Sequence, residues 1–188
     1  MAYRNGTYVA FAADGATNIL TSDIKYYRLL QGWKLMKGKD FNIIDSHEKG
    51  SILRKGSLDE TIKRTLRGRL DNSTRLLLLV GNTTRFDDDF VPYEIRYAID
   101  TCKLPVIVCY VNYDKRISNN IPQNLLNLLP KSLKDRMDNG TAKTIHIPFR
   151  ERILNRAIQD YHHNNLPSYS SSIYQDHLYN NIYTDGKL

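Results

Sequence analysis

One carboxylate, Glu94, combines a reactive group with a position that could serve chemistry, near the start of a predicted helix. The helix follows an apolar run at residues 76–80 and a polar loop that ends in three aspartates, which are N-cap candidates. At about 100° per residue, Glu94 projects into the seam between an apolar face and an aromatic flank. The apolar face comprises Val91, Ile95, Ala98, Ile99 and Cys102, and the flank comprises Phe90, Tyr93 and Tyr97.

The position of Glu94 on this helix leaves two interpretations open. Helical glutamates are usually exposed, and this one could simply be solvated or pair with a cation such as Arg85 or Arg96. Alternatively, the carboxylate lies at the lip of a pocket. Which one holds depends on the elements that position Glu94.

Strands rich in Val, Ile and Leu alternate with amphipathic helices along the chain, in the order β-α-β-α-β-α-β-α-β-α. The expected strands are residues 7–12, 40–44, 76–80, 104–111 and 144–147. This alternation predicts an α/β fold with a five-stranded parallel sheet and helices on both faces. Right-handed crossovers favour a flavodoxin-like strand order of 2-1-3-4-5.

Polar clusters follow the first three predicted strands, at residues 14–18, 45–47 and 82–85. Ligands of parallel α/β sheets bind beyond the carboxyl ends of the strands, so all three clusters belong to one edge. Glu94 begins the helix that is reached from that edge. This convergence favours a functional role for Glu94.

Composition is that of an ordinary globular protein, with 41% hydrophobic and 25% charged residues. No apolar run reaches the length of a membrane span, so we expect a cytoplasmic protein without a membrane partner. The net charge of +7 suits anionic ligands, but the basic residues are spread out and nucleic acid is not expected. Cys102 and Cys109 are expected to be core residues rather than a disulfide.

Several enzyme classes lack their sequence signals here. There is no glycine-rich dinucleotide motif, no P-loop and no GxSxG elbow. The five histidines show no metal-ligand spacing, so no metal is expected.

The last 25 residues differ in composition, since residues 164–188 are rich in Tyr, Ser and Asn. We therefore divide the chain into a domain at 1–163 and a C-terminal tail or arm at 164–188. The segment is either a weakly ordered polar tail or an arm that packs on its own domain or on a second subunit.

Three segments resemble the TIR-like domain of the bacterial Thoeris anti-phage defence family, ThsB type. They are YVAFA in the first strand, FNIIDSHE around the second, and LLLLVGNTTRFDDDFVPYEIRYAI. The resemblance covers roughly residues 7–150 and implies a three-layer TIR fold. In enzymatic TIR domains the glutamate on this helix is catalytic, and Glu94 matches it.

The resemblance implies cleavage of the nicotinamide–ribose bond of NAD+, which is a substrate here and not a cofactor. The implied product is a cyclic ADP-ribose isomer or related signal that activates a ThsA-type effector. A phage-derived trigger and homo-oligomer formation on activation are also implied. The candidate substrate-binding residues are Phe11, Asp14, Asp45, His47, Asn82, Thr84, Arg85, Phe90 and Tyr93. The first strand ends FAADGATN, without the aromatic-Ser-Tyr of many TIR domains.

Two other functions compete with this one. The chain could be a non-catalytic TIR-like scaffold or infection-sensing binding module. It could also be a deoxyribosyltransferase-like enzyme acting on nucleosides, since that related architecture uses a carboxylate at a sugar carbon.

Overall fold

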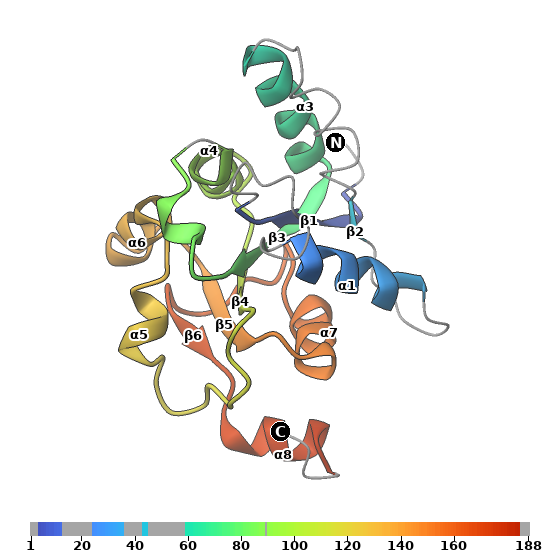
Figure 1. Cartoon of the computed structure of the whole chain (residues 1–188), viewed down its shortest axis with the longest axis vertical. Helices are drawn as coiled ribbons and strands as arrows, with labels where there is room; N and C mark the ends of the chain where they lie inside the picture. The colour runs from blue at the N-terminus through green and yellow to red at the C-terminus, as the bar shows by residue number, and fades with distance from the viewer. Residues whose placement is uncertain (1–3, 13–23, 36–42, 45–58, 89, 185–188) are drawn as a thin grey trace.

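A parallel sheet covered by helices on both faces forms the body of the structure, a computed structural model that describes residues 4–12, 24–35, 43–44, 59–88 and 90–184 (Figure 1). The expected α/β class is confirmed. Among the described residues the sheet has six strands rather than five, all parallel. Strand β1 pairs with both β2 and β3, and the full order is β2-β1-β3-β4-β5-β6.

The six strands lie close to the positions that the apolar runs predict, apart from the last one. They are β1 (Gly6–Ala10), β2 (Ile43–Ile44), β3 (Ser73–Val80), β4 (Val106–Tyr110), β5 (Thr144–Pro148) and β6 (Ser172–Ile173). Strand β6 was not predicted, because two residues within a polar segment carry no alternation that could reveal a strand.

Helices flank the sheet between the strands. They are α1 (Ile24–Leu35), α3 (Asp59–Asp71), α4 (Phe90–Arg96), α5 (Gln123–Leu126), α6 (Lys131–Asp138), α7 (Glu151–Asp160) and α8 (Asp176–Ile182). Two short turns complete them, the 3₁₀ turn η1 (Thr84–Phe86) and the π-helical turn η2 (Tyr97–Thr101). Pro130 separates α5 from α6, because proline cannot continue a helix.

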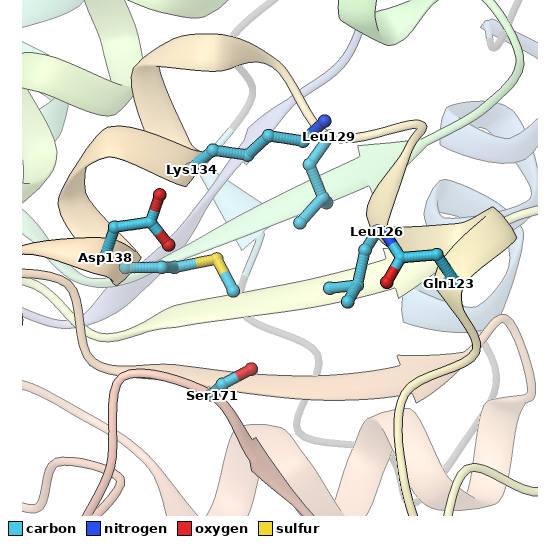
Figure 2. A pocket seen from close by; sticks show the side chains of 7 residues that line it. Gln123, Leu126, Leu129, Lys134, Asp138 and Ser171 are labelled. Atoms are coloured by element: carbon cyan, nitrogen blue, oxygen red, sulfur yellow. The ribbon is translucent and has the colours of Figure 1, made fainter.

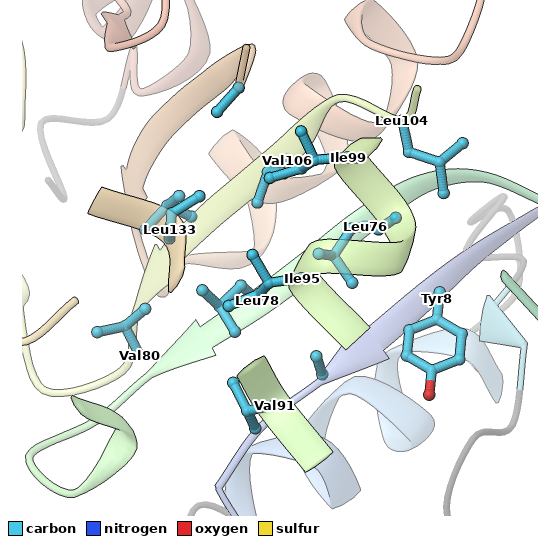
Figure 3. Close-up of a cluster of buried hydrophobic side chains, with 14 of the residues drawn as sticks. Tyr8, Leu76, Leu78, Val80, Val91, Ile95, Ile99, Leu104, Val106 and Leu133 are labelled. Atoms are coloured by element: carbon cyan, nitrogen blue, oxygen red, sulfur yellow. The ribbon is translucent and has the colours of Figure 1, made fainter. Parts of the chain in front are cut away.

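Two apolar cores lie on the two faces of the sheet. Helices α3, α4, α5 and α6 cover one face, and α1, α7 and α8 cover the other. Strand β3 serves both, since Leu76, Leu78 and Val80 face the first core while Leu77 and Leu79 face the second. Figure 3 shows part of the first core, with Val91 and Ile95 of α4 and Ile99 of η2 beside the β3 side chains.

The C-terminal segment packs on its own domain. Strand β6 pairs with β5, and Tyr174, Tyr179 and Tyr183 are buried in the second core. Their hydroxyls are used as well: Tyr174 donates to Asp160 at 2.8 Å, and Tyr183 accepts the backbone N–H of Ile153 at 3.3 Å. The described part of this segment, residues 164–184, therefore packs against its own domain.

A buried hydrogen-bond chain joins this segment to the sheet. The Tyr110 hydroxyl lies 2.9 Å from His146 Nδ1, and His146 Nε2 lies 2.8 Å from Thr144 Oγ1. Thr144 Oγ1 donates its only hydrogen to the carbonyl of Ser170, at 2.5 Å. It must therefore accept from His146 Nε2–H, which leaves Nδ1 to accept from Tyr110. Burial lowers the pKa of His146 to about 3, so the ring is neutral.

Candidate functional site

The loop after β3 is held by its own hydrogen bonds. The backbone N–H of Gly81 donates to Thr84 Oγ1 at 2.8 Å, and Thr84 is fully buried. The N–H of Phe86 donates to the carbonyl of Thr83 at 2.8 Å, which closes the η1 turn. A short polar side chain that bonds to nearby backbone favours such turns over a continued strand. The chain therefore turns at the carboxyl end of β3, as a site at this edge requires.

Helix α4 begins with a side-chain cap. Asp87 Oδ1 accepts the backbone N–H of Val91 at 3.3 Å. The run of three aspartates was expected to supply such a cap, and Asp87 provides it, while Asp88 is exposed and Asp89 lies outside the described residues. Pro92 occupies the first turn, where its missing N–H costs little.

Glu94 is buried, with 3% of its surface exposed. Its Oε1 accepts a hydrogen bond from the hydroxyl of Tyr8 at 2.5 Å, across 86 positions of sequence. Tyr8 belongs to β1 and is fully buried beneath the same helix layer. The interpretation of Glu94 as an exposed surface residue is thus wrong, because α4 lies over β1 and turns the seam position inward.

The apolar and aromatic flanks of this helix are arranged as the periodicity predicts. Val91 and Ile95 are buried, and Ala98, Ile99 and Cys102 continue the face through η2. Tyr93 and Tyr97 are half-buried and stack with ring centroids 6.2 Å apart. Lys63 of α3 lies 5.8 Å from the centroid of the Tyr93 ring, close enough for a cation–π contact. Burial also raises the pKa of the Tyr93 hydroxyl.

Phe11 does not join Glu94. It is buried in the core on the opposite face of the sheet, where its ring lies 5.2 Å from that of Tyr27. Side chains alternate between the two faces along a strand, so Tyr8 and Ala10 face α4 while Val9 and Phe11 face α1. Direct stacking of Phe11 on a ligand bound at Glu94 is therefore not supported by this arrangement.

The predicted binding residues of the loop and the start of α4 differ in their surroundings. Asn82 and Arg85 are exposed, and Phe90 is half-buried against the first core. Arg85 lies over the ring of Phe86, 4.5 Å from its centroid, and donates to the carbonyl of Asn127 at 3.4 Å. That contact points Arg85 toward α5. Three predicted residues, Asp14, Asp45 and His47, lie outside the described residues.

A groove of about 400 Å³ runs between α4 and α6, on the flank of α4 opposite Glu94. Arg85, Asp87, Asp88, Arg96, Asp135 and Arg136 are among its lining residues. Two of its cations are in ion pairs: Lys131 pairs with Asp135 at 2.7 Å, and Arg136 pairs with Asp100, which lies outside the lining. The Arg136 guanidinium lowers the pKa of Asp100 by hydrogen bonding. The Glu94 side of the helix and this groove are thus separate places.

Tyr8 is the functional candidate that sequence reasoning missed. The sequence did contain an indication of its role, because Tyr8 is an aromatic residue with a polar hydroxyl in an apolar, buried strand. A buried tyrosine hydroxyl usually has a hydrogen-bond partner. In the part of the chain that the structure describes, no three His, Cys, Asp or Glu residues gather closely enough to hold a metal ion. No helix in that part is long and apolar enough to cross a membrane.

The N-terminal part of the chain matches a known protein family. The family described as "Thoeris protein ThsB, TIR-like domain" matches residues 8–116, which is more than half of the chain. The matched stretch begins at Tyr8 and contains Glu94, so both partners of the buried hydrogen bond lie within it. The match ends before α5, so the α5–α8 region lies beyond it. The chain therefore belongs to the ThsB TIR-like family, and this membership implies a role in Thoeris antiviral defence.

Proposed function

We propose that this protein cleaves the bond between nicotinamide and ribose in NAD+, with Glu94 as the catalytic residue. The observation that carries this function is the buried Glu94 carboxylate of α4, which accepts a hydrogen bond from the Tyr8 hydroxyl. The ThsB TIR family is generally NAD-processing, which supports the same substrate. NAD+ is consumed here and not recycled.

The chemistry requires one well-placed negative charge. When the C–N bond breaks, its electron pair passes to the pyridinium nitrogen and neutral nicotinamide leaves. Positive charge then develops on the ribose ring, as in glycoside cleavage, and a nearby carboxylate stabilises it. Water can add to the ribosyl cation and lose a proton to give ADP-ribose. A nitrogen of the adenine can instead close the ring and give a cyclic isomer.

The burial of Glu94 adds a condition to this reaction. Only 3% of the residue is exposed, so NAD+ reaches the carboxylate only when the side chains that cover it move. We propose that assembly of several copies, prompted by a phage-derived trigger, accompanies this opening. The product, a cyclic ADP-ribose isomer or a related conjugate, then activates a ThsA-type effector in the cytoplasm.

The test is NAD+ turnover in lysates of phage-infected cells that express the full chain, with products identified by mass spectrometry. Glu94→Gln keeps the shape of the side chain and removes its charge. We expect it to lower turnover roughly 100- to 1000-fold, as loss of a key electrostatic group does elsewhere. The matched control is Glu60→Gln, because Glu60 is exposed and pairs with Arg67 on the surface of α3 at 3.2 Å. Equal turnover by Glu94→Gln and the control would exclude Glu94 as the catalytic residue.

The burial of Glu94 also favours a second candidate, a TIR-like scaffold that performs no chemistry. In that case the Tyr8–Glu94 bond only ties α4 to β1. Glu94→Gln would then lower the midpoint of thermal unfolding, and neither it nor the parent protein would consume NAD+ in infected cells. Exchange of bases between nucleosides, without NAD+ loss, would instead identify a deoxyribosyltransferase-like enzyme.

A further inference from the structure

A second cavity lies in the part of the chain beyond the family match. Its volume is about 350 Å³, and it lies between α5, α6 and the segment that leads into β6 (Figure 2). The lining residues are Gln123, Leu126, Leu129, Lys134, Met137, Asp138 and Ser171. They come from three separate stretches, and the C-terminal segment completes the wall. The cavity therefore depends on the tertiary packing of that segment.

The interior of the cavity is apolar. Leu129 is buried, while Leu126 and Met137 are half-buried and pack against the first core. Ligand sites occupy roughly 300–1000 Å³, so this cavity falls at the lower end of the range and suits a small molecule. Methionine at such a wall adapts to different apolar shapes, because its side chain is unbranched and flexible.

Two side chains of opposite charge, Lys134 and Asp138, lie at the rim of the cavity. Lys134 and Asp138 are four residues apart on α6, a spacing at which such side chains can pair. In Figure 2 Lys134 extends toward Leu129, away from Asp138. Among the described residues, neither side chain makes an ion pair. Both charges are thus available to a ligand.

The same helix carries a matched pair that is closed. Lys131 and Asp135 have the same residue types and spacing, and their charged groups lie 2.7 Å apart. This pair lies on the flank of α6 that faces α4, where it lines the other groove. The open pair borders the cavity and the closed pair does not. Helix geometry alone therefore does not explain why Lys134 and Asp138 are apart.

We propose that this cavity binds a small zwitterion with an apolar body, of which a free amino acid with a large apolar side chain is the simplest example. The Lys134 ammonium binds the carboxylate of the ligand, and Asp138 binds its ammonium group. Leu126, Leu129 and Met137 contact the apolar body. The Gln123 amide, oriented by its 3.1 Å hydrogen bond to Asn127, borders the mouth. This site is separate from Glu94, and its occupation is independent of the proposed NAD+ chemistry.

The experiment is isothermal titration of the full chain with phenylalanine, methionine and leucine at millimolar concentrations. We expect saturable binding of at least one of them. The N-acetyl amide of the same amino acid lacks both charges and should bind at least about tenfold more weakly, because it loses two charge-assisted hydrogen bonds. No saturable binding by any of the three would overturn the proposal, as would equal binding of the uncharged compound.

Variants then locate the site. Lys134→Met and Asp138→Asn should each weaken binding about tenfold, whereas Lys131→Met and Asp135→Asn at the closed pair should not. Ser171 is exposed and borders the cavity, so Ser171→Trp fills the space without disturbing the core and should abolish binding. Retention of wild-type affinity by Ser171→Trp, or by both Lys134→Met and Asp138→Asn, would contradict this location. These experiments do not measure NAD+ turnover. They therefore test the proposed ligand site independently of the function of Glu94.

Discussion

Two tyrosine hydroxyls are buried on the same face of the sheet, and they donate hydrogen bonds to different acceptors. Tyr8 on β1 donates to the Glu94 carboxylate of α4 at 2.5 Å. Tyr110 on β4 donates to His146 on the neighbouring strand at 2.9 Å. Both tyrosines are almost completely inaccessible to solvent. The two regions therefore present the same donor in similar surroundings, and the acceptor is what differs.

The acceptor decides what each region can do: this neutral histidine supports the structure, whereas a carboxylate can also take part in chemistry. His146 is neutral, and its bonds continue through Thr144 to the Ser170 carbonyl, so each polar atom of that chain has a partner within the fold. A fully satisfied neutral network fixes the position of a segment, here the approach to β6. A carboxylate such as that of Glu94 carries negative charge and can in addition stabilise positive charge on a substrate. The two regions can be tested against each other with matched substitutions.

Among the substitutions that compare the two regions, Tyr8→Phe should have the largest effect, because it removes a donor from a buried carboxylate. We expect the free energy of unfolding to fall by about 3 kcal/mol and NAD+ turnover to fall roughly tenfold, since Glu94 loses its orientation. Urea denaturation and turnover in infected-cell lysate measure the two effects. Turnover that stays at the wild-type level would mean that Tyr8 does not position the reacting group.

Tyr110→Phe is the matched change in the second region. It leaves His146 Nδ1 without its donor and should lower the free energy of unfolding by about 1–3 kcal/mol. Turnover per folded molecule should remain unchanged, because this network lies apart from Glu94. A loss of turnover as large as that of Tyr8→Phe would remove the distinction between the two regions.

Acid should weaken the second region through His146. Its pKa is about 3 in the folded protein, whereas an unfolded histidine has a pKa of roughly 6.5. The neutral ring thus contributes stability that is complete above the unfolded pKa and is lost as pH falls toward 3. Between pH 7 and pH 5 this amounts to about 2 kcal/mol. Urea denaturation should show a smaller loss for His146→Gln over that interval, and an equal loss in both proteins would argue against a neutral His146.

Lys103→Gly should have the smallest effect on stability. It changes the chain just after η2, the turn that follows the Glu94 helix. Lys103 follows η2 with a positive φ of 55°, a conformation that disfavours side chains with a β-carbon. Glycine relieves this strain but gains freedom in the unfolded chain, so a net gain of about 0.5–1 kcal/mol is expected in thermal unfolding. Lys103→Ala keeps the β-carbon and serves as the control. A gain of the same size with alanine would point to the lost charge instead.

Local patterns predicted most of the fold because the relevant forces are local or periodic. The apolar runs placed the first five strands. The aspartate run predicted a cap, which Asp87 supplies. Both cysteines are free and buried, as expected for core residues. Strand β6 escaped prediction, because its pairing with β5 depends on where the C-terminal segment docks.

The candidate site was only partly accessible to the same reasoning. Helix periodicity placed Glu94 in a seam but did not say whether the seam faces solvent or the sheet. Strand alternation could have placed Phe11 and Tyr8 on opposite faces, yet it could not say which face α4 covers. The roles of Asn82, Thr84, Arg85, Phe90 and Tyr93 in substrate binding remain predictions. So do those of Asp14, Asp45 and His47, which lie outside the described residues.

The sequence by itself determined the alternating α/β class, the loop-to-helix segment with Glu94, and membership of the ThsB TIR-like family over residues 8–116. These follow from residue type and spacing, which act over a few turns of chain. Only the tertiary structure decided that Glu94 is buried against Tyr8, that the C-terminal segment joins the sheet, and that Ser171 closes a cavity against α6. Each of these joins residues more than 25 positions apart, where hydrogen bonds and packing depend on how helices dock on the sheet.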